Sequence, residues 1–137
     1  VARKILILAR ESGLEIELDD VRIESFLPKQ VSDLDDINLF LESLKKYKTH
    51  FNSYLKSAKL NNSSLKYVAK LDKGKAEVGL KEIQQGHDFF NIDGSDNIIL
   101  FYTSRYRDNP LIIKGAGAGA AVTASGIFGD IIRIGKR

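Results

Sequence analysis

The chain has 137 residues, 43% of them hydrophobic and 28% charged, and its 21 basic and 18 acidic residues give a net charge of +3. This length and composition are typical of one globular domain with its own core, and the chain is too short for two domains to be expected in it. Cysteine is absent, which excludes disulfides and thiol chemistry. The absence of cysteine fits a reducing cytoplasm, so we expect a cytoplasmic protein. No apolar run approaches the ~18 residues that cross a bilayer, so we expect no membrane partner.

The basic residues are dispersed, and the densest group, Lys45–Lys48, is short and falls within a predicted helix. Nucleic-acid-binding proteins concentrate their positive charge in a stripe or patch. We therefore expect no nucleic-acid partner, and a basic nucleic-acid module is the third class of function considered.

Methionine is absent, including at position 1, and the first residues already show a helical pattern without a capping residue. We therefore expect the chain to be a fragment of a longer protein.

The first half of the chain predicts two helices with strands between them. Apolar residues at helical spacing predict a short, largely buried helix over residues 1–12, which a glycine ends. Alternation over residues 14–27 predicts one or two short strands, broken at Asp19-Asp20. Ser32 is predicted to cap a long helix that runs to Leu60.

The second half predicts mainly strands, followed by a final helix. The predicted elements are, in order, a β-hairpin (65–71 and 75–83), a loop (84–96), a buried strand (97–102), an apolar strand (111–113) and a helix (120–134). Together these elements predict an α+β fold, with one layer of mixed or antiparallel sheet and helices packed on one face.

Residues 115–126 are almost all glycine or alanine, and they join the last strand to the last helix. Their first six residues fit the pattern G-x-G-x-x-G/A of dinucleotide-binding turns. A complete dinucleotide site also needs a second strand and an acidic residue about twenty positions later, which the chain does not reach. Two interpretations stay open at this point: contact with a cofactor, and close packing of a helix.

Other chemistry is only weakly indicated. Ser104, His87 and Asp96 are the residue types of a hydrolase triad, but no nucleophile elbow surrounds any serine. His50 and His87 lack metal-ligand spacing, so we expect no metal site. From the pattern alone, Lys4 is interpreted as a side chain at a helix edge that reaches solvent.

Three stretches taken together resemble the homoserine dehydrogenase family. Residues 1–10 are similar to the family's helix whose signature ends in Asp-Val-Ala-Arg-Lys. Residues 94–106 are similar to its final-strand region, and residues 110–130 to its C-terminal segment. The length of the 29–60 insert and the ending at 132–135 are similar to bifunctional aspartokinase–homoserine dehydrogenases.

The resemblance implies interconversion of L-homoserine and L-aspartate 4-semialdehyde with NADP or NAD, in threonine, methionine and isoleucine biosynthesis. It implies that Lys4 is the catalytic lysine that donates a proton to the carbonyl oxygen, which reverses the interpretation of Lys4 given above. It implies that Gly119 contacts the cofactor, with Gly117 as a neighbouring candidate. It also implies a homodimer formed through the sheet.

The resemblance further implies that residues 1–137 are the C-terminal, substrate-binding and catalytic portion of such an enzyme. The NAD(P)-binding Rossmann domain and a substrate-binding aspartate would precede Val1, so we expect the fragment alone to be inactive. The alternative is an amino-acid-binding regulatory or interaction module of the aspartokinase type, without catalysis.

Overall fold

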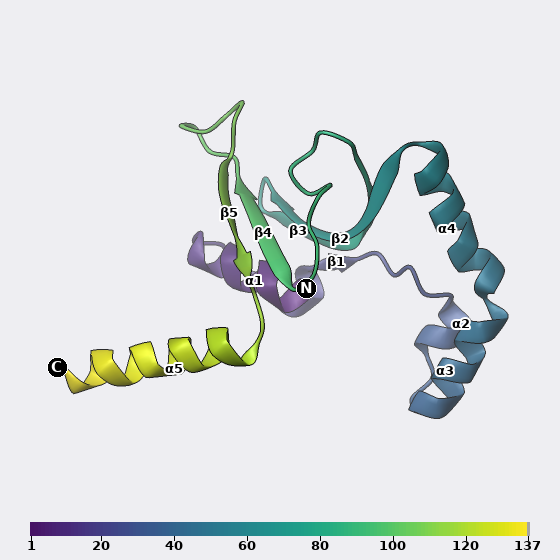
Figure 1. The fold of residues 1–137 in the computed structure, drawn as a ribbon, viewed down its shortest axis with the longest axis horizontal. Helices are drawn as coiled ribbons and strands as arrows, with labels where there is room; N and C mark the ends of the chain where they lie inside the picture. The colour runs from purple at the N-terminus through teal and green to yellow at the C-terminus, as the bar shows by residue number, and fades with distance from the viewer. Residues whose placement is uncertain (137) are drawn as a thin grey trace. The chain divides into compact units, whose positions relative to one another are not determined.

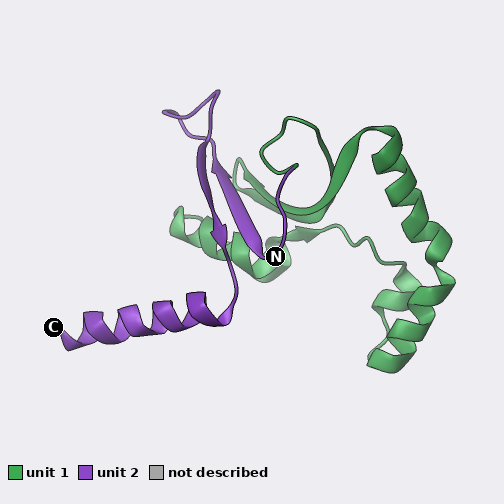
Figure 2. Ribbon diagram, viewed as in Figure 1, with its two compact units in different colours: residues 1–90 green, residues 91–137 purple. Residues whose placement is uncertain are grey.

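The computed structural model describes residues 1–136, and the chain divides into two compact units, residues 1–90 and residues 91–137 (Figure 2). The elements of the first unit (Figure 1) are α1 (Ala2–Glu11), η1 (Leu18–Asp20), β1 (Arg22–Ile23), α2 (Lys29–Ser32), α3 (Ile37–Lys46), α4 (Lys48–Leu60), β2 (Ser63–Asp72) and β3 (Lys75–Gln84). Those of the second are β4 (Asp96–Phe101), β5 (Leu111–Ala116) and α5 (Ala120–Gly135). Each unit is described below by itself.

The sheet of the first unit has three strands in the order β1-β3-β2. Strands β2 and β3 pair antiparallel over their whole length, and the short β1 pairs parallel with β3. Lys73 and Gly74 form the turn with φ of 49° and 77°. Positive φ at both central residues is the geometry of the two-residue turn that matches strand twist. The predicted hairpin is therefore confirmed.

Helix α1 rests on this sheet through one apolar face. Ile5 and Leu6 join Val21, Ala76 and Val78 in the buried core of the unit. The glycine after α1, residue 13, has φ of 90°, as expected of a residue that ends a helix. The helix is therefore present as predicted. The expectation that it is largely buried holds for one face only, since the exposed fraction of Ile7 is 60%.

Helices α1 and α4 both contact β2. The core contacts of α1 include Ala69 and Leu71 on β2. Helix α4 is fastened at its end by Ser63, whose Oγ donates to the carbonyl oxygen of Ala58 over 3.2 Å. Ser63, Ala69 and Leu71 are separated by even numbers of residues in one strand, and such residues share a face. The α+β class and the mixed sheet are therefore confirmed, and the packing of helices on one face stays a prediction.

The stretch 14–27 differs from its prediction, because only Arg22 and Ile23 form a strand. The carboxylate of Asp20 accepts the backbone N–H of Glu17 over 2.8 Å, which stabilises the turn η1. Arg10 of α1 also donates its Nε to the carbonyl oxygen of Ile16 over 3.0 Å. Side chains thus take the backbone groups that a strand would need. The predicted break at Asp19-Asp20 is correct, and the first predicted strand is wrong.

The predicted long helix from Ser32 to Leu60 consists of separate helices. The hydroxyl of Ser32 donates back to the carbonyl oxygen of Lys29 over 3.0 Å, so Ser32 lies in α2. The actual cap of α3 is Asp36, whose Oδ1 accepts the backbone N–H of Asn38 and that of Leu39 over 2.8 and 3.0 Å. Tyr47, with ψ of 22°, separates α3 from α4. The prediction of Ser32 as the cap is therefore wrong.

The second unit consists of a two-stranded antiparallel sheet and α5. Strands β4 and β5 pair from Asp96↔Ala116 to Phe101↔Leu111. The described strands thus form two sheets rather than the single layer expected. No residue of β4 is fully buried, unlike the buried strand predicted there. Helix α5 has close to its predicted bounds. None of the helices within residues 1–136 combines the length and the apolar character that a bilayer crossing requires.

Candidate functional site

Lys4 lies in the first turn of α1 and its side chain is exposed. Its backbone N–H donates to the carbonyl oxygen of Val1 over 2.9 Å, and the neighbouring Ile5 is buried in the core. The core therefore holds the Cα of Lys4 while its side chain extends from the helix end.

The N-terminal end of α1 concentrates positive charge. Arg3 and Lys4 are both exposed there, and the first turn contains no acidic residue. The N-terminal end of a helix is already the positive end of its dipole, so these two cations add to a positive field. Such a field stabilises an oxygen that gains negative charge during a reaction. The role of Lys4 as a proton donor stays a prediction.

The glycine turn from β5 to α5 presents open backbone. Gly119 has φ of 134° and ψ of 151°, a conformation that side-chain-bearing residues rarely adopt. A Cβ added at Gly119 would meet no atom within 4 Å. Gly119 is the N-cap of α5, and no side chain caps the N–H groups of the first turn. Exposed N–H groups at a helix N-terminus are suited to phosphate, so these residues fit a dinucleotide cofactor.

Gly117 has a different environment within the same turn. A Cβ added there would overlap the side-chain amide nitrogen of Asn97 and would lie 2.5 Å from its Cγ. The missing side chain at Gly117 is thus explained by packing against Asn97 inside the unit. Contact between Gly117 and a cofactor stays a prediction, as does contact at Gly119.

Helix α5 exposes its apolar side chains. Exposed large hydrophobic residues occur along its whole length: Val122, Ile127, Phe128, Ile131, Ile132 and Ile134. Exposed apolar patches of this kind mark surfaces that another protein surface covers. A Cβ added at either glycine inside this helix, Gly126 or Gly129, would meet no atom within 4 Å. Within residues 1–136, these glycines are not explained by helix packing.

Lys4 and the two glycines belong to different units. Lys4 lies in the unit of residues 1–90, whereas Gly117 and Gly119 lie in that of residues 91–137. The two glycines therefore lie together in one turn of the second unit, whereas Lys4 lies in the first unit.

The residues of the hydrolase alternative have local roles. Asp96 forms an ion pair with Lys114 at 3.6 Å between β4 and β5. His87 accepts the backbone N–H of Phe89 at its Nδ1 over 3.0 Å. Each of these contacts is explained by local folding, so neither supports a nucleophilic triad with Ser104.

The other histidine is part of an aromatic cluster. His50 Nε2 lies 3.0 Å from the carbonyl oxygen of Phe26, and its ring packs edge-on against Phe51 and Tyr54. The side chain is half-buried, as expected for a histidine at the edge of a core. Among residues 1–136, no three metal-ligating side chains gather into a cluster.

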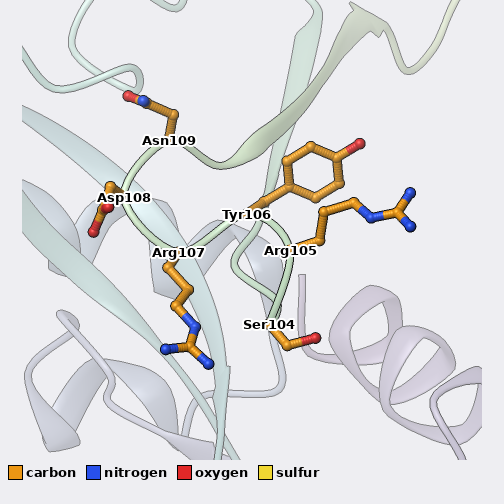
Figure 3. A pocket seen from close by; sticks show the side chains of 6 residues that line it. All are labelled: Ser104, Arg105, Tyr106, Arg107, Asp108 and Asn109. Atoms are coloured by element: carbon orange, nitrogen blue, oxygen red, sulfur yellow. The ribbon is translucent and has the colours of Figure 1, made fainter.

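The loop from β4 to β5 borders an open hollow of about 350 Å³, which is lined by residues 104–109. Figure 3 shows that these side chains fan outward, with Arg105 and Arg107 pointing in different directions. A binding pocket needs a few polar groups that converge on one point. The loop therefore lacks the arrangement of a site.

The perturbed pKa values belong to structural contacts in the first unit. A hydrogen bond from Lys81, with Nζ 2.8 Å from the Oε2 of Glu24, lowers the pKa of Glu24, and the same bond raises the pKa of Lys81. A hydrogen bond from Asn61 over 2.9 Å lowers the pKa of Glu82. These pairs connect strands and a helix end, and they lie outside the candidate site residues.

Asn97 is the residue that the sequence motifs did not single out. It lies in β4, opposite Gly115, at the start of the strand predicted over residues 97–102. The only available signal was an asparagine at the start of a predicted strand, and its packing partner is twenty residues away. Contacts of that separation follow from strand register, which the sequence does not reveal.

Comparisons with known proteins match almost the whole chain to one family. The family model of homoserine dehydrogenase matches residues 1–132. The chain is 41% identical over 133 residues to the bifunctional aspartokinase/homoserine dehydrogenase of Haemophilus influenzae, covering 97% of this chain and 16% of that protein. It is 39% identical over 140 residues to the homoserine dehydrogenase of Saccharomyces cerevisiae, covering 100% of this chain and 39% of that protein.

A solved structure is similar as well. The crystal structure of a protein of unknown function from Candida auris superposes with a TM-score of 0.86 at 40% identity, covering 99% of this chain and 38% of that one. The chain thus spans about two fifths or less of the length of each of these proteins.

Proposed function

The chain belongs to the homoserine dehydrogenase family, and we propose that it is the substrate-binding and catalytic portion of such an enzyme. The proposed reaction interconverts L-homoserine and L-aspartate 4-semialdehyde. The observation that carries the proposal is the family match over residues 1–132, together with identity of 39–41% to two family relatives across almost the whole chain. The proposed role belongs to the longer protein of which these residues are a part.

We assign the proton transfer to Lys4. Reduction of the aldehyde places negative charge on its oxygen, and the Lys4 ammonium would donate a proton to that oxygen. In the reverse direction, the lysine amine would accept the proton of the homoserine hydroxyl. The positive end of the α1 dipole would stabilise the same developing charge. A positioned acid of this kind contributes typically 10²–10⁴-fold to a rate.

We assign cofactor contact to the turn at Gly119. A bound NADP or NAD would supply the chemistry of hydride transfer. The open backbone at Gly119 and the uncapped N–H groups of α5 would allow a phosphate-bearing group to approach closely. Gly117 lies two residues away and stays a neighbouring candidate.

The exposed apolar face of α5 supports a further part of the proposal. The family relatives named above are more than twice as long as this chain, and a helix that exposes six large apolar side chains needs a covering surface. We propose that the cofactor-binding domain of the full-length protein covers α5. The glycines within α5 would then permit the close approach of that domain.

We also propose that the protein is a homodimer formed through its sheet, as the family resemblance implies. Light scattering on the purified protein measures this directly. A dimer is expected at high micromolar concentration, and a monomer would count against an intact sheet interface.

The cytoplasmic localisation stays a prediction; among the relatives, the maize and Arabidopsis proteins are named chloroplastic.

The experiment that tests the activity uses the full-length parent protein. It should form reduced cofactor from homoserine and NADP⁺ or NAD⁺, and the rates with the two cofactors give the preference between them. The 137-residue chain alone, as the matched control, should form none. Absence of homoserine-dependent turnover by the folded parent would contradict the proposal.

The alternative function is an amino-acid-binding regulatory or interaction module. Its support is the identity of 41–43% to bifunctional aspartokinase/homoserine dehydrogenases. In that case the parent would bind an amino acid, but its dehydrogenase turnover would not depend on Lys4.

A further inference from the structure

The turn before α5 is fastened to the start of β4 at one carbonyl group. The backbone N–H of Gly117 donates to the carbonyl oxygen of Ser95 over 3.2 Å. The side-chain Nδ2 of Asn97 donates to the same oxygen over 3.3 Å. The ladder between β4 and β5 has its last pair at Asp96↔Ala116. The bond from Gly117 therefore extends the attachment by one residue into the glycine turn, whereas the bond from Asn97 holds its own carboxamide at the start of β4.

The side chain of Asn97 also fills the space in front of Gly117. A Cβ at Gly117 would lie 2.5 Å from the Cγ of Asn97 and 3.2 Å from its Oδ1. The φ of Gly117 lies outside the left-handed region. A positive φ is therefore not what favours glycine here, and the three atoms nearest to an added Cβ all belong to the carboxamide of Asn97.

The three glycines of the turn thus differ in what they require. A Cβ at Gly115 or at Gly119 would meet no atom within 4 Å, whereas one at Gly117 would overlap Asn97. Gly119 is distinguished by its φ of 134°. It begins the hydrogen bonding of α5, because its carbonyl oxygen accepts the backbone N–H of Thr123 over 3.0 Å. The segment that Asn97 holds leads directly into this cap.

We propose that Asn97 is a positioning residue, which seats Gly117 and thereby fixes the Gly117–Gly119 turn in the conformation that binds the cofactor. This inference rests on the proposed function, since it assumes that the cofactor contacts the turn. Asn97 acts through the turn and not on the substrate. Loss of its side chain should therefore weaken cofactor binding because the free protein must order the turn on binding.

The test uses the full-length parent and measures NADPH binding by fluorescence titration, together with the KM for homoserine and kcat. Asn97→Ala should raise the Kd for NADPH about tenfold, or about 1.4 kcal/mol, while the KM for homoserine stays within about twofold. Asn109→Ala, an exposed asparagine of the same unit, is the matched control and should change neither. Hydrogen exchange should also be faster in the peptide that covers residues 115–121.

A second pair of variants tests the contact from the other side. Gly117→Ala alone should weaken NADPH binding, because its methyl group and Asn97 cannot occupy the same space. The double variant Asn97→Ala/Gly117→Ala should bind NADPH better than Gly117→Ala, because the overlap is removed. If Asn97→Ala does not fold, Asn97→Ser takes its place. NADPH binding by Gly117→Ala is then compared with NADPH binding by the double variant Asn97→Ser/Gly117→Ala.

The outcomes separate the two proposals. NADPH binding by Asn97→Ala that equals the wild type, or equal losses for cofactor and homoserine, would overturn the role of Asn97. A wild-type parent that binds neither NADPH nor NADH would overturn the proposed function itself, and a parent that binds only NADH is titrated with NADH in the same way.

Discussion

Helix α1 holds Lys4 through its buried face, and truncation of that face gives a quantitative prediction. Leu6 is 9% exposed and packs in the core with Val21 and Val78. Leu6→Ala removes three carbon atoms, worth about 0.8 kcal/mol each in transfer from water. A cavity adds about 1 kcal/mol, because the core relaxes only in part. The expected loss in the free energy of unfolding of the first unit is therefore about 3 kcal/mol.

The matched control lies next to it on the same helix. Ile7→Ala also removes three carbon atoms, but Ile7 is 60% exposed, so the transfer term falls to about 1 kcal/mol. Alanine is the better helix former by about 0.4 kcal/mol, which offsets part of that loss. The expected net loss is about 0.5 kcal/mol.

Urea unfolding followed by circular dichroism measures both variants. With a slope of about 1–3 kcal/mol per molar, Leu6→Ala should lower the midpoint of the first unit by at least about 1 M. Hydrogen exchange in the peptide of α1 localises the effect to that helix. Equal losses for Leu6→Ala and Ile7→Ala would refute the assignment of the buried face.

Two further predictions concern the first unit. Asp36→Ala should destabilise α3 by about 0.5–2 kcal/mol, because Asp36 accepts hydrogen bonds from two backbone N–H groups at the helix start. Ser32→Ala should destabilise α3 less, and hydrogen exchange over residues 37–46 compares the two variants. The hydrogen bond from Lys81 lowers the pKa of Glu24 below its ordinary 4.5, so its stabilisation is present above that value and is lost as pH falls through the lowered pKa. Glu24→Gln should therefore flatten the acid side of the stability–pH curve, with Glu42→Gln as the control; an unchanged curve would show that the pair contributes nothing measurable.

Much of the fold follows from local pattern. The hairpin β2–β3 was predictable because alternation and a turn with glycine occur together. Helices α1 and α5 were predictable from their apolar spacing and the glycines that flank them. The loss of the first strand was not predictable, because Arg10 and Asp20 take its backbone groups through contacts that only the fold creates. The capping residue was placed four positions early, because Ser32 and Asp36 are both good caps in sequence.

The candidate site was predictable only through the family resemblance. Lys4 by itself has the pattern of an exposed helix-edge lysine, and its exposure in α1 agrees with that pattern as well as with catalysis. The glycine pattern indicated close approach but not what approaches. Asn97 was not found, because its contact with Gly117 depends on the pairing of β4 with β5.

The central claim is that Lys4 performs proton transfer in homoserine dehydrogenation by the full-length protein. The most direct measurement is kcat for homoserine oxidation in the parent carrying Lys4→Ala, beside Arg3→Ala, which removes the neighbouring exposed cation of the same turn. The account predicts a loss of about 10²-fold or more for Lys4→Ala and a much smaller loss for Arg3→Ala. Turnover of Lys4→Ala at the wild-type rate, with the protein folded, would contradict the account.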